Sequence, residues 1–346
     1  MARRKTKTRA KKKTKKNSRT GGKSKSKSKT VTAGRSRAPG RSGSPALLSR
    51  GVSYWSFPGG MENRTDIISA LSSARQLGFS SLELGISDTG VLTLETSRSE
   101  CRALARAAEA VEVGLSSLAT NLYWTTNLAS PRAAERNRAV EITTALIERA
   151  AWLDARAVVV IPGWVHSRSR PEAPPVPYDE AMARARESVK KCVKIAEKAR
   201  ITLALLNAPG GLMLSPLEFS AFIEGLRSRR AAACLDIGTA ALYGHPHHWI
   251  KLLRSRIALI RATDLKRSFE GNVARSRRFR NFGTPQGWGF MAACCQPGTG
   301  SVDWPAVGQA LRKARYKGPL IALSHPPRPG LLEHTGAFLD KLIGSS

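Results

Sequence analysis

Short apolar runs recur along the chain from residue 51 onward, and each gives way to polar residues at its C-terminal end. Eight of these runs have the length of a strand and are apolar at successive positions, which is typical of parallel strands covered by helices on both faces. The eight predicted strands are 51–56, 80–85, 113–119, 156–161, 201–206, 231–236, 257–262 and 319–323.

Helical patterns lie between the predicted strands. Residues 65–77 carry apolar side chains at 67, 68, 71 and 74, on one face of a helix, and Gly78 follows as a stop signal. Strands that alternate with helices predict the α/β class, and eight such units predict a single (β/α)8 TIM barrel over residues 49–346. Further helices are predicted at 98–110, 132–152, 179–199, 216–228 and 305–315.

The carboxyl ends of the strands share one face of such a barrel, and that face carries the chemistry of these folds. Four predicted strands end there in Leu206, Asp236, Arg261 and Leu323. One aspartate, one arginine and two leucines are an unusual set for the mouth of a barrel enzyme. The sequence therefore predicts a pocket at these four residues without intact metal chemistry.

Charge separates the chain into two parts. Of the formal net charge of +32, residues 1–50 supply 19 Lys or Arg and no Asp or Glu. Apart from alanines, residues 1–45 are almost without apolar side chains, so we expect a disordered tail over residues 1–48. Such a tail attracts nucleic acid or another polyanion without sequence preference, and the alternative is a solvated extension without a partner.

The remaining composition indicates an intracellular protein. No apolar stretch follows the basic residues as in a secretory signal, although a transit peptide stays open, and none approaches the ~18 residues of a membrane helix. The five cysteines are odd in number and match no zinc or redox spacing. We therefore expect a cytoplasmic protein with reduced thiols and no membrane contact, and the sequence predicts no oligomeric state.

Several runs resemble the sugar phosphate isomerase/epimerase family, the xylose isomerase-like TIM barrels. The most specific are LDIGTAALYGHPHHWI (235–250), ATDLKRS (262–268) and GTGSVDWPAVGQAL (298–311), and the resemblance covers 51–340 in order. It implies a sugar or sugar-phosphate ligand and one divalent cation such as Mn or Mg. In the family the cation polarises the sugar carbonyl, and two carboxylates move a proton on and off the adjacent carbon.

The resemblance also places the family's four metal ligands on this chain. Its two glutamates correspond to Leu206 and Leu323, its histidine to Arg261, and its aspartate to Asp236, which alone is kept. We therefore expect no metal cofactor. We also expect Arg261 to supply the missing positive charge by pairing with Asp236, with the leucines packed around the pair.

Other candidates line the same face, each with an ordinary alternative. Glu83 either contacts a sugar hydroxyl or pairs with a basic neighbour, and we favour pairing. Asn207 either binds substrate or caps a loop; Asp264 and Lys266 hold a phosphate, the loop or each other. His325, two residues beyond Leu323, is a displaced ligand only if a metal binds, which one nearby aspartate does not support. We expect the histidines of GHPHHW at the surface: His245, His247 and His248.

Three functions follow. The first is a catalytically degenerate barrel, a pseudoenzyme that binds a sugar-like ligand or a partner. The second is an active metal-dependent ketose/aldose isomerase or 3-epimerase with a relocated site. The third is a polyanion-binding protein that uses its tail.

The long loops 163–180 and 266–300, the latter with the basic run RSRRFR, are predicted on the catalytic face.

Overall fold

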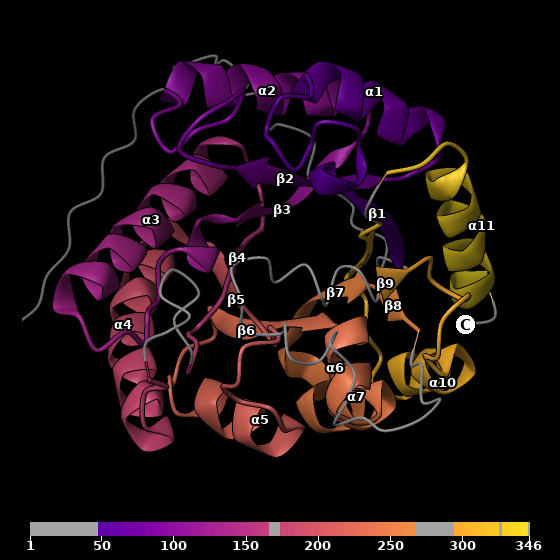
Figure 1. Ribbon diagram of the computed structural model, residues 1–346. Coiled ribbons are helices and arrows are strands. Elements are labelled where there is room, and N and C mark those ends of the chain that lie inside the picture. The colour runs from indigo at the N-terminus through magenta and orange to yellow at the C-terminus, as the bar shows by residue number, and fades with distance from the viewer. Residues whose placement is uncertain (1–47, 166–173, 267–293, 325–326, 345–346) are drawn as a thin grey trace, which may run out of the picture. The chain divides into compact units, whose positions relative to one another are not determined.

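The computed structural model describes residues 48–165, 174–266, 294–324 and 327–344. Eight parallel strands close into a barrel in the order β1-β10-β7-β6-β5-β4-β3-β2, which confirms the predicted TIM barrel (Figure 1). The strands are β1 (Ser49–Ser53), β2 (Ser81–Ile86), β3 (Gly114–Thr120), β4 (Ala157–Val160), β5 (Thr202–Leu206), β6 (Ala231–Asp236), β7 (Ile257–Ala262) and β10 (Pro319–Ala322).

Helices cover the outside of this barrel (Figure 1). Their boundaries follow the capping residues of the sequence: Ser97 and Glu100 form a capping box at one helix, and Ser215 caps another whose first residue is a proline. The helices are α1 (Ile67–Gln76), α2 (Arg98–Ala110), α3 (Ala133–Trp152), α4 (Tyr178–Ala199), α5 (Pro216–Glu224), α6 (Ile237–Tyr243), α7 (Pro246–Leu253), α10 (Trp304–Lys313) and α11 (Leu331–Gly344).

The first predicted strand is displaced from its observed position. It runs over Ser49–Ser53, while Tyr54–Ser56, predicted as its end, form a short 3-10 turn. The aromatic pattern YWS is as compatible with a buried turn as with a strand, because all three residues are buried in either case. The turn brings Trp55 over the mouth of the barrel.

A two-stranded antiparallel ribbon follows the seventh barrel strand. It joins β8 (Asp264–Leu265) to β9 (Cys294–Cys295). The residues 267–293 between them, the residues 166–173 of the other long loop and the predicted tail lie outside the described residues. Within the described part of the chain, no helix is both long enough and apolar enough to cross a membrane.

Candidate functional site

The four strand-end residues of the sequence all lie at the carboxyl ends of the barrel strands. Leu206 ends β5, Asp236 ends β6, Arg261 is the second-last residue of β7, and Leu323 directly follows β10. Asp236 and Arg261 are register partners on neighbouring strands. Leu206, Asp236 and Arg261 are buried and Leu323 is half-buried. Folding therefore brings the predicted residues into one region.

An ion pair crosses the interior of the barrel. Arg261 Nη2 donates to Glu83 Oε1 over 2.9 Å, although Glu83 lies on β2, which is not a neighbour of β7. The Ser117 hydroxyl donates to the other carboxylate oxygen over 2.9 Å. The side chains of Glu83 and Arg261 are 0% and 5% exposed, so this pair is withdrawn from water.

Trp55 covers the guanidinium of this pair. The Arg261 Cζ lies 5.3 Å from the centroid of the Trp55 ring, which is cation–π geometry. Burial alone would lower the pKa of Arg261, but the charge of Glu83, with smaller contributions from Cys234 and Asp236, raises it above its ordinary value. The group therefore remains a cation, and its buried Nε has no hydrogen-bond partner in the part of the chain that the structure describes.

Asp236 is held by different contacts. Its Oδ1 accepts from the Thr239 backbone N–H over 2.8 Å, as the N-cap of α6, and from the Thr263 hydroxyl over 2.7 Å. Burial raises the pKa of Asp236, and the two hydrogen bonds and the charge of Arg261 offset this only in part. The carboxyl group is thus in an environment that disfavours its charged form.

The predicted pairing of Arg261 with Asp236 is wrong. Both residues are described, and the ion pair of Arg261 is with Glu83. The reason is that Asp236 already caps the first turn of α6, whereas Ser117 is, among the described residues, the one donor to Glu83 besides Arg261. Glu83 does pair with a basic side chain, as favoured from the sequence.

The model of the family described as "Xylose isomerase-like TIM barrel" matches residues 71–342. The chain belongs to this family. No curated protein sequence matches it significantly.

Solved structures of the same architecture include sugar epimerases. A D-psicose 3-epimerase crystallised with D-fructose superimposes with a TM-score of 0.66 at 16% identity, over 86% of this chain and 100% of the other. A D-tagatose 3-epimerase-like protein superimposes with a TM-score of 0.66 at 20% identity, over 86% of this chain and 98% of the other. The D-psicose 3-epimerase of Clostridium cellulolyticum H10 with D-tagatose superimposes with a TM-score of 0.65 at 17% identity, over 85% of this chain and 98% of the other. Likeness at this identity shows a shared fold.

A divalent cation does not fit the residues that this xylose isomerase-like barrel places at its mouth. Leu206 and Leu323 have no lone pair to donate, and the Arg261 guanidinium brings a permanent positive charge beside Asp236. Among the described residues, no group of three or more His, Cys, Asp or Glu is placed to hold a metal ion. His325, the displaced ligand considered from the sequence, lies outside the described residues.

Of the remaining candidates, Asn207 has hydrogen-bond partners within the barrel. The side chain of Asn207 bridges β5 to β6, since its Oδ1 accepts from the Asp236 N–H over 2.6 Å and its Nδ2 donates to the Asp236 carbonyl over 3.1 Å. Lys266 is exposed at the end of β8. His245, His247 and His248 cluster at the start of α7, with ring centroids 4.4–5.5 Å apart.

Asp264 holds the loop that leads into α10. Its carboxylate accepts five N–H groups over 2.8–3.2 Å, four from the backbone and one from the Trp304 indole. Gly300 is required there because a Cβ at this position would lie 2.1 Å from Asp264 Oδ1. The backbone donors are Leu265, Gly298, Gly300 and Val302.

Sequence reasoning missed three residues of the site: Trp55, Ser117 and Thr263. Ser117 and Thr263 have hydroxyl groups that are common in strands and carry no recognisable spacing. A signal for Trp55 exists in Gly85 on β2, because a Cβ there would lie 2.6 Å from the Trp55 indole nitrogen. A glycine within a barrel strand marks a close approach by another group.

Proposed function

We propose that this chain is a catalytically degenerate xylose isomerase-like barrel that binds a hydroxylated, sugar-like ligand without isomerising it. The observation that carries the proposal is the buried Glu83–Arg261 ion pair beneath the mouth of the barrel. Arg261, a permanent cation, stands at a position where the family resemblance implies a metal ligand, and its guanidinium pairs with the carboxylate of Glu83.

The reaction of the family requires groups that this site has replaced. Moving a proton on and off carbon needs two bases within reach, and Leu206 and Leu323 cannot accept one. Asp236 and Glu83 are the carboxylates at hand, but both oxygens of Glu83 and one of Asp236 already accept hydrogen bonds. Arg261 stays protonated, so it cannot act as a base.

The same site keeps features that suit a neutral polar ligand. The Arg261 Nε has no partner among the described residues, but it is buried and the Trp55 ring lies against the guanidinium, so a ligand reaches this donor only when Trp55 moves aside. An N–H donor next to an aromatic ring matches a sugar, which presents hydroxyl groups on its edge and C–H groups on its face. Binding of this kind needs no proton transfer.

A proton-exchange assay distinguishes this proposal from an active epimerase with a relocated site. The purified full chain is incubated with D-fructose or D-tagatose and Mn or Mg in D2O, and deuterium at the carbon beside the carbonyl is followed by NMR. We expect no incorporation and less than one-tenth of a metal ion retained per chain. Stoichiometric metal together with incorporation that scales with protein concentration would overturn the proposal.

A designed variant provides the matched control. Replacing Leu206→Glu, Arg261→His and Leu323→Glu together restores the ligand types that the resemblance implies, while Asp236 is unchanged. Because the variant removes the ion-pair partner of Glu83, circular dichroism first checks that it folds. Titration with Mn should then show metal binding by the variant and none by the wild type. Equal metal binding by both proteins would mean that the replaced residues are not what excludes the cation.

A further inference from the structure

The amino-terminal face of the barrel, opposite the mouth, carries an unusual series of turns. Every helix-to-strand turn before β2 to β7 and before β10 contains one residue with a positive φ. In chain order these residues are Gly78, Glu112, Asp154, Arg200, Arg227, Arg254 and Arg315, with φ between 45° and 74°. The last four precede β5, β6, β7 and β10, which are consecutive strands of the barrel. We call these four residues the arginine arc.

Arginine is a poor choice for the backbone of these turns. A positive φ suits glycine, which has no Cβ to crowd the neighbouring carbonyl, and asparagine or aspartate next, because their short polar side chains can hydrogen-bond locally. Arg254 is the most strained of the arc, with φ 45° and ψ −119°. Arginines in the turns before four consecutive strands lower local stability. Backbone stability therefore does not explain why arginine stands at these positions.

The charge of the arc is unneutralised. Arg200, Arg227, Arg254 and Arg315 are all exposed, and among the described residues none lies in an ion pair with a carboxylate. The segments that hold them, 197–201, 224–230, 251–256 and 312–318, contain 12 Lys or Arg and two acids. On the other half of the face the acids are neutralised, since Glu112 pairs with Arg75 and Asp154 with Arg102.

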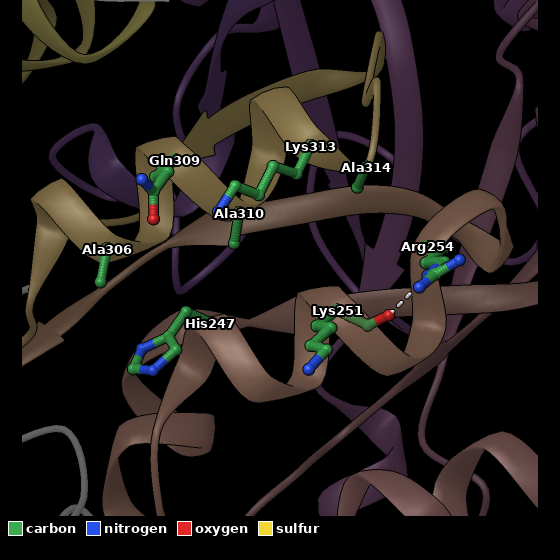
Figure 2. Close-up of a pocket in the computed structure, with 8 residues that line it drawn as sticks. All are labelled: His247, Lys251, Arg254, Ala306, Gln309, Ala310, Lys313 and Ala314. Atoms are coloured by element: carbon green, nitrogen blue, oxygen red, sulfur yellow. Dashed lines mark hydrogen bonds between the residues drawn. The ribbon is translucent and has the colours of Figure 1, made fainter.

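A groove leads from this face between α7 and α10. It has a volume of about 430 Å³, and Figure 2 shows Lys251 and Arg254 on one wall and Lys313 on the other. No carboxylate is among its eight lining residues. The groove thus adds two lysines to the arc at Arg254 and provides a concave surface for an anion.

We propose that the arginine arc and this groove bind the phosphodiester backbone of nucleic acid. The cations extend over four adjacent turns, which exceeds the size of one phosphate and suits a series of phosphates. Arginine contacts phosphate with two parallel N–H groups, which a lysine cannot do. This site lies at the opposite end of the barrel from the mouth and does not depend on the function proposed there.

A membrane surface is the main competing polyanion. Membrane-binding faces combine cations with exposed large apolar groups that insert among the lipids. Within the described residues, Leu252 is the one large apolar side chain in the four arc segments that is exposed, at 38%. The face therefore offers charge without an apolar anchor, which favours nucleic acid.

The test replaces all four arc residues in the full chain with glycine. Because the basic tail is the same in every protein, a difference between variants reports on the barrel alone. Binding to a labelled DNA duplex and to a labelled single-stranded RNA is measured by anisotropy over a range of salt concentrations. We expect the magnitude of the slope of log K against log salt to fall by about 3.6 for the duplex, at about 0.9 for each of the four lost phosphate contacts.

Two variants with matched changes control this result. Arginine-to-lysine replacement at the four positions keeps the charge and should keep most of the slope. Glutamine at Arg64, Arg98, Arg106 and Lys190, which are exposed elsewhere on the barrel, removes the same charge and should leave the slope within 1 of wild type. An equal loss in the glutamine variant would show that net charge matters and the arc does not, which overturns the proposal.

Folding does not confound the comparison. Glycine suits the backbone of the arc, so the thermal midpoint of the glycine variant should equal or exceed that of the wild type. If it falls instead, asparagine at the four positions, which also tolerates a positive φ, replaces glycine in the same assay. Loss of binding to phosphatidylserine vesicles with unchanged binding to both nucleic acids would assign the arc to membranes and overturn the proposal.

Discussion

Glu83 and Arg261 lie on strands that are not neighbours in the barrel, and their side chains meet 2.9 Å apart in its interior. Contacts on both sides of the pair are fitted to it. Ser117 satisfies the second oxygen of Glu83, while Gly85 leaves space for Trp55 to cover the guanidinium. The surrounding residues therefore accommodate Arg261 specifically. A simple replacement of a histidine at this position would not by itself provide these contacts.

Glu83→Gln should destabilise the protein strongly. The variant leaves the Arg261 charge buried without a counter-ion, and removing one partner of a buried pair costs roughly 3–5 kcal/mol. Arg261→Met should cost a similar amount because Glu83 is then the unpaired charge. Urea unfolding measures both, and the double variant should lose less than the sum of the two single losses.

The exposed pair of Arg75 and Glu112 is the control for that experiment. Its side chains are 53% and 72% exposed, so Glu112→Gln should change the free energy of unfolding by less than about 1 kcal/mol. Equal losses for Glu83→Gln and Glu112→Gln would contradict the energetic role given to the buried pair.

Asp236→Asn should stabilise the protein at neutral pH. The asparagine Oδ1 can accept from Thr239 and Thr263 as the carboxylate does, and the variant avoids burying a charge. Because burial raises the pKa of Asp236 in the folded state, the native protein holds a proton more tightly than the unfolded chain does. The contribution of Asp236 to stability is therefore present below its unfolded pKa of about 3.8 and is lost as the pH rises through the folded value.

The measurement compares the free energies of unfolding of wild type and Asp236→Asn between pH 3.5 and 8. The advantage of the variant should be smallest at the acidic end, grow as the pH rises from about 3.8, and become constant above the folded pKa. An advantage independent of pH would indicate that the carboxyl group does not titrate in this window. A disadvantage that grows with pH would reverse the sign of the argument.

The barrel could be predicted from sequence because its signals are local and repeated. Strands apolar at successive positions, such as 231–236, and caps such as Ser215 with Pro216 each specify their own segment. The first strand covers Ser49–Ser53 where 51–56 is predicted, because YWS is compatible with either a strand or a buried turn. Local pattern thus determines which elements form and how they alternate.

The partner of Arg261 could not be predicted in the same way. The family pattern places Asp236 and Arg261 on neighbouring strands, which favours an ion pair between them. The choice of Glu83 depends on which carboxylate already has donors, and Asp236 has the Thr239 N–H and the Thr263 hydroxyl. Such competition between hydrogen bonds is decided in three dimensions and leaves no periodic signal.

Asp264→Ala should loosen the approach to α10. The substitution leaves five N–H donors without their acceptor, at a cost of roughly 2–4 kcal/mol, since some regain water. Amide exchange at Gly298 and Gly300 should accelerate. Asp303→Ala is the nearby comparison: it removes one N-cap bond, to the Ala306 N–H, and should cost about 1 kcal/mol. Similar losses and unchanged exchange would show that Asp264 does not hold the loop.

Gly85→Ala should disturb the covering of Arg261 by Trp55. The added Cβ would lie 2.6 Å from the Trp55 indole nitrogen and 3.1 Å from Tyr54, so the indole has to move, at a cost of about 1–3 kcal/mol and with altered tryptophan fluorescence. Gly114→Ala, whose Cβ would meet only Ser80 O at 3.7 Å, should cost little. Adding Trp55→Phe should recover part of the stability lost in Gly85→Ala, because the smaller ring fits beside alanine. A Gly85→Ala protein as stable as Gly114→Ala would mean that Trp55 is not held against β2.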